Sequence, residues 1–207
     1  MAIEEPKFQV VTKEVTQEGT FEVRQYAPFI VAETWVDGDM DAASNKGFRA
    51  IADYIFGNNQ AVGALPGDKS ATKIAMTAPV TIEPVAPKSE KIAMTVPVTI
   101  EPSAGMAGTG QWRVHFVMPS EYTLATLPKP NNGAVQLREV AAKTVAVVTY
   151  SGFNTQSRIQ QETQKLTDWM QRNKLEAKGG AVLARYNPPL TLPIWRRNEV
   201  HFEVVKP

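Results

Sequence analysis

The order of elements predicted by the hydrophobic pattern occurs twice along the chain, and this repetition constrains the fold more than any other feature. Apolar residues alternate where a strand is expected and recur every three or four positions where a helix is expected. In the first half, strand, helix, strand and strand fall on 29–36, 41–56, 72–82 and 111–118. In the second half they fall on 144–150, 155–173, 181–186 and 199–205. The final strands even share the tripeptide Val-His-Phe, at Val114-His115-Phe116 and Val200-His201-Phe202.

Two βαββ units of this kind predict one α+β domain over residues 1–207, with half-repeats at about 21–119 and 135–207. We expect a distorted antiparallel sheet or barrel in which a pseudo-twofold relates the halves and two helices flank the strands. The length of 207 residues is sufficient to bury a core without disulfides or a structural metal. Further strands are expected at 8–15, 21–26 and 135–140.

A second repeat, a near-identical duplication of the amino-acid sequence, occupies residues 73–84 and 91–102. Each copy reads Lys-Ile-Ala-Met-Thr-x-Pro-Val-Thr-Ile-Glu-Pro, and the copies differ only in Ala78 against Val96. The β-branched residues favour a strand, and the central proline restricts it to an edge or a bulge because proline cannot donate to a ladder. The copies could pair as a hairpin, or one could loop out while the other pairs. An exposed copy could also be an edge through which two chains pair, so the sequence leaves the possibility of a homo-oligomer open.

Charge and cysteine content exclude several classes of function. The 22 Lys and Arg residues nearly cancel the 21 Asp and Glu residues, and Arg196-Arg197 is the one adjacent basic pair, so we expect no nucleic-acid partner. The absence of Cys excludes disulfides, thiolate metal sites and Cys nucleophiles. Without an 18-residue apolar run or an N-terminal leader pattern, we expect no membrane span and a soluble, cytoplasmic protein, although a removed leader would leave no trace.

Catalytic motifs are absent from the sequence. It contains no Gly-x-Ser-x-Gly, no His-Glu-x-x-His and no phosphate-binding glycine loop. With two His and no Cys, few pairs of nucleophile and base can be assembled. We therefore expect a binding protein rather than an enzyme.

Several motifs, in order along nearly the whole chain, resemble the SOUL haem-binding protein family. They are Phe-Glu-Val-Arg-Gln-Tyr at 21–26, the Lys-Ile-Ala-Met-Thr-x-Pro-Val element, and the segments 116–123, 127–130, 150–153, 184–189 and 195–200. The resemblance implies a distorted antiparallel barrel with two helices, related to effector-binding domains of bacterial multidrug regulators and to gyrase-inhibitor-like proteins. It also implies binding of haem or another tetrapyrrole without turnover, in a groove along the first helix with basic residues near the propionates.

On the first helix, the resemblance makes Lys46 and Arg49 the candidate propionate contacts, with Phe48 and Ala52 as the apolar floor of the groove. Asp53 follows them and would repel a propionate. Some members of the family carry a His, proposed as the iron ligand, at the position occupied here by Gln25. An amide oxygen is a poor haem ligand, so we expect that mode of ligation to be absent.

The residue types that ligate haem iron give the other candidates. His115 and His201 are the two histidines and are candidate axial ligands, although strand alternation places both opposite their apolar neighbours and favours exposed positions in solvent. Met76 and Met94 hold equivalent places in the duplicated element, where core packing is favoured over ligation. Tyr186 could stack on a ligand or offer a phenolate, but a tyrosine that anchors a turn is more common.

These observations favour a carrier or buffer that holds haem, as a ligand rather than a catalytic cofactor, by apolar contact. The alternative is a small-molecule effector-binding module, whose sign would be a pocket with a buried carboxylate for a cationic ligand. A haem-dependent enzyme is the least favoured, because no acid–base pair can be assembled beside the ligand.

Overall fold

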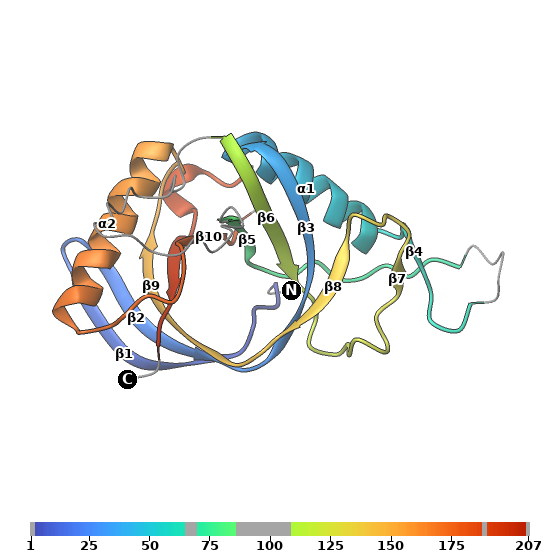
Figure 1. The fold of residues 1–207 in the computed structure, drawn as a ribbon, viewed down its shortest axis with the longest axis horizontal. Coiled ribbons are helices and arrows are strands. Elements are labelled where there is room, and N and C mark those ends of the chain that lie inside the picture. Colours follow the sequence, from blue (N-terminus) through green and yellow to red (C-terminus); the bar gives the residue numbers. More distant parts are fainter. Residues whose placement is uncertain (1–2, 65–69, 86–108, 188–189, 206–207) are drawn as a thin grey trace, which may run out of the picture.

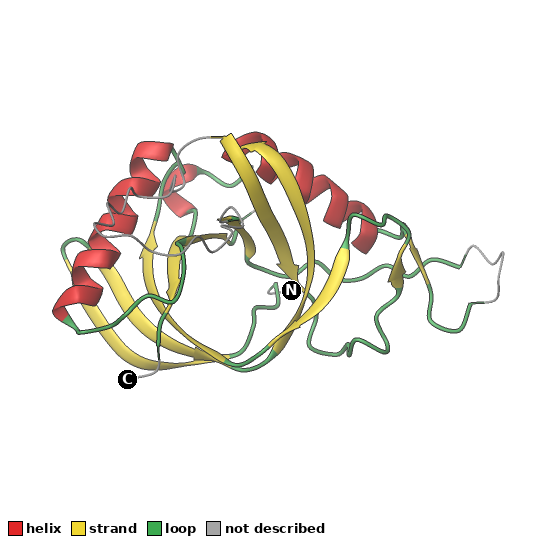
Figure 2. Cartoon of the chain, viewed as in Figure 1, coloured by secondary structure: helices red, strands yellow, loops and turns green. Residues whose placement is uncertain are grey.

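The computed structural model describes residues 3–64, 70–85, 109–187 and 190–205, and within them nine strands form one curved antiparallel sheet (Figures 1 and 2). Its strand order is β1-β2-β9-β11-β10-β5-β6-β3-β8. The strands are β1 (Phe8–Thr16), β2 (Gly19–Tyr26), β3 (Phe29–Asp39), β5 (Val80–Pro84), β6 (Thr109–Val117), β8 (Gln136–Val140), β9 (Lys143–Tyr150), β10 (Val182–Arg185) and β11 (Asn198–Glu203). The remaining elements are α1 (Met40–Ile55), α2 (Gln156–Arg172), the short pair β4 (Asn59–Gln60) and β7 (Lys129–Pro130), and the 3-10 turn η1 (Pro193–Trp195).

The sheet has a pseudo-twofold centre where β5 pairs with β10 and Ile82 lies opposite Leu183. Moving outward from this centre, β6 corresponds to β11, β3 to β9 and β8 to β2. Each helix directly follows the corresponding strand, α1 after β3 and α2 after β9. The expected α+β sheet with two flanking helices is therefore confirmed, although β1 and β8 remain at the two ends of the strand order and do not close a barrel.

The two helices cover the convex face of the sheet, α1 over β3 and β6 and α2 over β9 and β11 (Figure 1). Asp39 caps α1 by accepting a hydrogen bond from the Ala42 backbone N–H, and Thr155 caps α2 in the same way from Arg158. Phe21 of β2 stacks on Trp169 of α2 with ring centroids 5.5 Å apart. The apolar core thus lies between the helices and the sheet, where burial of these rings stabilises the fold.

The expected strand at 72–82 is wrong over most of its length, because β5 begins only at Val80. Before it, the Ile74 N–H donates to the Ile55 carbonyl at the end of α1, and the Ala78 N–H donates to the Glu4 carbonyl. Pro79 has no N–H to give to a ladder, so the strand starts after it. The second copy of the duplicated element, 91–102, lies outside the described residues, and its pairing stays a prediction.

No helix among the described residues combines the length and the apolar character needed to cross a bilayer.

Candidate functional site

The face of the sheet opposite the helices, here called the inner face, carries the charged side chains. Successive side chains of a strand point to opposite faces, so the neighbours of core residues such as Val114 and Val200 point inward. A pocket of about 230 Å³ opens on this face. Its polar lining consists of Thr81, Glu83, Arg113, His115, Arg138, Lys143, Lys178, His201 and Glu203.

His115 lies in this pocket with 7% of its surface exposed, so the expectation of an exposed position in solvent is wrong. Burial lowers the pKa of its imidazole well below 6.5, and the nearby charges of Lys143, Arg113 and Arg138 lower it further. Its Nδ1 is buried and makes no hydrogen bond within the described part of the chain. His115 is therefore a neutral imidazole whose buried Nδ1 has no partner, which is the form in which histidine ligates a metal.

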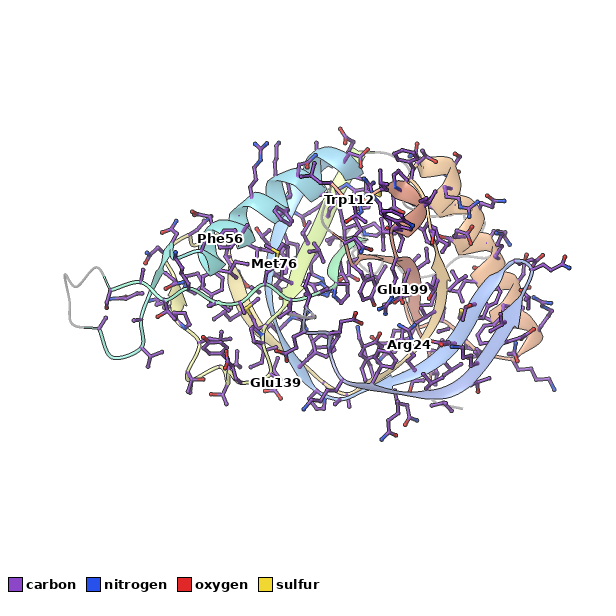
Figure 3. All side chains as sticks on the ribbon, turned by 180° about the vertical axis from the view of Figure 1, so that it is seen from behind. Arg24, Phe56, Met76, Trp112, Glu139 and Glu199 are labelled. Carbon is purple, nitrogen blue, oxygen red and sulfur yellow. The ribbon has the colours of Figure 1, made fainter. Side chains whose placement is uncertain are left out.

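His201 lines the same pocket, also buried, but its Nε2 lies 2.8 Å from a carboxylate oxygen of Glu199. Glu199 is fully buried and accepts two further hydrogen bonds from Arg24, at 2.9 and 3.1 Å (Figure 3). Burial alone would raise the pKa of Glu199, but the hydrogen bonds and charges of His201 and Arg24 outweigh it and lower the pKa strongly. Glu199 is thus a permanent anion that orients His201.

Tyr186 belongs to this buried network as well. Its hydroxyl donates to Glu199 at 2.6 Å, and the guanidinium of Arg197 lies 3.7 Å from the centroid of its ring. Burial and the neighbouring carboxylate raise the pKa of the phenol, which keeps it protonated. The tyrosine therefore anchors the chain ahead of β11, and its oxygen is engaged in a hydrogen bond within the protein.

The pocket has a cationic excess. Arg113 pairs with Glu83, Lys178 pairs with Glu203 at 3.2 Å, and Arg138 pairs with Glu33 at 2.7 Å behind the lining. Lys143 forms no ion pair with a carboxylate among the described residues, and its ammonium lies 5.9 Å from the ring centroid of Phe29.

Burial lowers the pKa of Lys143, as expected for an ammonium removed from water without a partner. Among the described residues, four cations thus face three carboxylates, and Lys143 is the one that forms no ion pair. This excess favours an anionic ligand.

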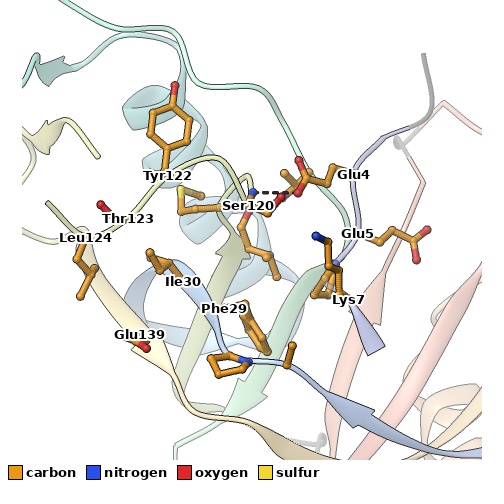
Figure 4. Close-up of a pocket in the computed structure, with 16 residues that line it drawn as sticks. Glu4, Glu5, Lys7, Phe29, Ile30, Ser120, Tyr122, Thr123, Leu124 and Glu139 are labelled. Carbon is orange, nitrogen blue, oxygen red and sulfur yellow. Dashed lines mark hydrogen bonds between the residues drawn. The ribbon is translucent and has the colours of Figure 1, made fainter. Parts of the chain in front are cut away.

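A second pocket, of about 290 Å³, lies beside the first and shares Pro6, Phe29 and Val117 with it (Figure 4). The N-terminal segment runs between them and is fixed there by Glu4, whose carboxylate accepts a hydrogen bond from the Ser120 N–H at 2.9 Å. Sites for small molecules span about 300–1,000 Å³. Each pocket alone lies below that range.

Among the described residues that line the two pockets, none is one of the candidates on α1. Lys46 and Arg49 are exposed on the outer side of the helix. Phe48 packs on Phe116, with ring centroids 5.3 Å apart, and Ala52 is buried, so both residues hold the helix on the sheet. Their part in a haem groove stays a prediction.

Of the two methionine candidates, the structure describes Met76 alone. Met76 is 37% exposed in the segment ahead of β5, and Met94 lies outside the described residues. Neither pocket is lined by Met76.

Sequence reasoning missed Lys143, Arg113 and Arg138, which form the cationic part of the site. For Arg113 the signal was the alternation of polar and apolar residues along 109–117, which places a charged or polar side chain at every second position from 109 to 115. Arg138 and Lys143 lie on other strands, β8 and β9, outside this pattern. If the polar side chains of 109–117 were assigned to an inner face that is closed off from solvent, the alternation would predict a polar pocket.

Comparisons with known proteins agree with this fold. A family model described as "SOUL heme-binding protein" matches residues 3–89 and 83–203. "Heme-binding protein 2" of Homo sapiens is 27% identical over 203 residues, which cover 96% of this chain and 85% of that protein. The protein of the same name from Mus musculus is 27% identical over 204 residues, with the same coverage.

Two solved structures share the fold at low sequence identity. The crystal structure of the EcmrR C-terminal domain matches with a TM-score of 0.57 and 14% identity, covering 90% of this chain and 97% of that one. A structure described as a hydrolase from Listeria innocua matches with a TM-score of 0.52 and 11% identity, covering 89% and 91%. At these identities the likeness extends to the fold alone.

Proposed function

Because the chain belongs to the SOUL heme-binding protein family, we propose that it binds haem or another tetrapyrrole without turnover and serves as a carrier or buffer for it. The observation that carries the proposal is one pocket on the inner face that holds both a neutral imidazole and a cationic excess. Haem offers the matching chemistry: its iron accepts a nitrogen ligand, and its two propionates are anions that suit the cationic lining.

His115 fits the role of iron ligand better than His201. Its buried Nδ1 has no hydrogen-bond partner in the described part of the protein, so ligation would satisfy a group that is costly to leave unpaired. The Nε2 of His201 already contacts Glu199 at 2.8 Å. Bound haem would supply the iron, while the chain supplies a fixed, uncharged nitrogen.

Lys143 fits the role of propionate contact. Lys143 is half-buried and pairs with no carboxylate in the described residues, and a carboxylate from a ligand would complete the missing pair. Arg113 and Arg138 are partly committed to Glu83 and Glu33 and would add attraction at longer range. The apolar edge of the macrocycle would contact Phe29 and Val117, which line both pockets.

The same charges argue against the cationic effector that the alternative function requires. Glu199 is a buried carboxylate, but Arg24, Arg197, Tyr186 and His201 already occupy its oxygens. Glu33 is likewise paired with Arg138. A cationic ligand would therefore find few carboxylate oxygens available and an unpaired ammonium in its way.

The proposal is tested by titrating the purified protein with haemin and following the visible absorbance. Saturable binding at one haem per chain, with a shifted Soret band, is expected. The His115→Ala variant should change the band and weaken binding, whereas His201→Ala should leave the axial ligation unchanged. Non-saturable binding of undefined stoichiometry would overturn the proposal.

A double variant of α1, Lys46→Ala with Arg49→Ala, separates the two candidate sites. If the propionates bind at the inner face, this variant should bind haemin like the wild type while Lys143→Gln binds several-fold more weakly. The reverse result would place the propionates along α1, as the family resemblance implies. Metal-free porphyrin should bind more weakly than haemin by the contribution of the bond from His115 to the iron, and the binding that it retains measures the apolar packing.

A further inference from the structure

Two loops that lie side by side hold five large apolar side chains in solvent. Four of them come from the loop before β11 and one from the loop before α2 (Figure 1, red segment beside the start of α2). These residues, here called the apolar tip, are Phe153, Leu190, Leu192, Ile194 and Trp195. Leu190 is 97%, Ile194 71% and Trp195 69% exposed. Scattered apolar side chains are ordinary on a surface, but a cluster of this kind marks a site of contact.

The apolar tip is held in place by its own backbone and does not collapse onto the protein. The Trp195 N–H donates to the Leu192 carbonyl at 2.9 Å, which closes the turn η1. The Gly152 N–H donates to the Pro193 carbonyl at 2.9 Å and ties the two loops together. Arg196 donates from Nε to the Thr191 carbonyl and lies over the ring of Phe153. The fold therefore presents these side chains outward in a fixed arrangement.

The charged groups that reach the surface around the apolar tip are cationic. The two segments that carry it, 150–161 and 187–198, contain three Arg and no Asp or Glu, in a chain whose net charge is +1. Arg158 pairs with Glu162, whose carboxylate is fully buried while the guanidinium reaches the surface. Arg197 pairs with the buried Glu199 and also with the half-exposed Glu5, so the uncompensated outward charge belongs to Arg158 and not to Arg197. The positive end of the α2 dipole, at Gln156, faces the same region. The outward charge is complementary to an anionic surface.

We propose that the apolar tip docks the protein on an anionic lipid surface, inserting Trp195 and its apolar neighbours at the interface while Arg196 and Arg158 face the headgroups. Tryptophan beside arginine is the pairing that such an interface selects, since the indole ring lies at headgroup level and the guanidinium meets the phosphates. None of the residues of the apolar tip lines either of the two pockets described above. This surface is separate from the tetrapyrrole site.

Vesicle flotation tests the proposal with the full chain. We expect flotation with vesicles of phosphatidylcholine and phosphatidylserine, weaker flotation with phosphatidylcholine alone, and a blue shift of the tryptophan fluorescence that the variant without Trp195 lacks. The double variant Ile194→Ser/Trp195→Ser should lower the partition by about tenfold or more, because two large apolar side chains no longer enter the bilayer. Phe56→Ser is the matched control, since Phe56 is a comparably exposed ring (58%) at the end of α1.

Three results would overturn the proposal. The first is no flotation of the wild type with either vesicle. The second is equal flotation of the wild type and the double variant. The third is a wild-type dimer in solution that the double variant abolishes without any vesicle binding, which would assign the apolar tip to a second copy of the chain. Phe153→Ser, in the other loop, repeats the test should the double variant misfold, and unchanged haemin titrations would show that the tetrapyrrole site is intact.

Discussion

Arg24 and Glu199, which lie 175 positions apart in the chain, form a two-fold hydrogen-bonded ion pair across β9, from the strands on either side of it. Both side chains are removed from water, with 4% and 0% of their surface exposed. A buried pair of this kind is costly to break, because the remaining charge keeps its desolvation penalty without its partner.

Replacing Arg24 by Met should therefore lower the free energy of unfolding by about 3–5 kcal/mol. Urea unfolding followed by circular dichroism measures this change. Lys13→Met is the control, since the Lys13 side chain is 56% exposed and Glu22 keeps Arg24 as its partner without it, so it should cost no more than about 1 kcal/mol. Equal losses in the two variants would contradict the importance given to the buried network.

The stability of the protein should fall as the pH is lowered through 6.5. The unfolded chain takes up a proton on His115 near its ordinary pKa of 6.5, whereas burial keeps the folded imidazole neutral to lower pH. The unfolded state thus binds more protons below 6.5, and each unit of pH below it removes up to about 1.4 kcal/mol from this group. Unfolding of His115→Gln at pH 7, 6 and 5 should show a shallower slope; a slope equal to that of the wild type would count against a buried neutral His115.

Gly47 lies in the middle of α1 where the helix crosses β6. A Cβ at this position would lie 2.6 Å from the Cβ of Val114, closer than packed atoms can approach. Alanine favours a helix over glycine by about 1 kcal/mol, but overpacking of a core costs about 1–3 kcal/mol, so Gly47→Ala should destabilise the protein. Thermal unfolding of Gly47→Ala tests whether the change destabilises the protein. The control is Gly133→Ala, where nothing lies within 4 Å of the added atom. Stabilisation by Gly47→Ala would show that the helix and the strand can move apart.

Haemin affinity should depend on salt through Lys143. Raising NaCl from about 0.1 to about 0.5 M shortens the screening length and should weaken binding several-fold. In Lys143→Gln this dependence should be smaller, since the unpaired cation of the pocket is gone. Lys46→Gln, which removes an exposed cation of α1, should retain the wild-type dependence. An identical salt response in both variants would leave Lys143 without a role in binding.

Local sequence patterns predicted the helices closely. Expected ranges of 41–56 and 155–173 compare with Met40–Ile55 and Gln156–Arg172, because apolar spacing and the caps Asp39 and Thr155 are local signals. The strand expected at 72–82 failed because its β-branched residues resemble a strand, while the contacts that decide its path lie far away. Ile74 bonds to the end of α1 and Ala78 to Glu4, and neither partner is evident from the pattern.

The histidines show the same limit at the candidate site. Alternation correctly placed His115 and His201 on the face opposite the core, but that face was expected to lie in solvent. Whether such a face is wet depends on how strongly the sheet curves and on where the N-terminal segment runs, and both are properties of the whole chain. For the same reason the unpaired state of Lys143 could be found only in three dimensions.

The exchange of strands between the halves has a consequence for how the protein is made. Although β2 leads directly into β3, it pairs with β9; likewise β8 leads into β9 and pairs with β3. Each half-repeat therefore donates a strand to the other, and neither can complete its own ladder. Such long-range pairing has to wait for most of the chain to leave the ribosome, and folding dominated by distant contacts is slow. A fragment ending between the halves would expose the unpaired edges of β2 and β3, which invites aggregation rather than an independent half-domain.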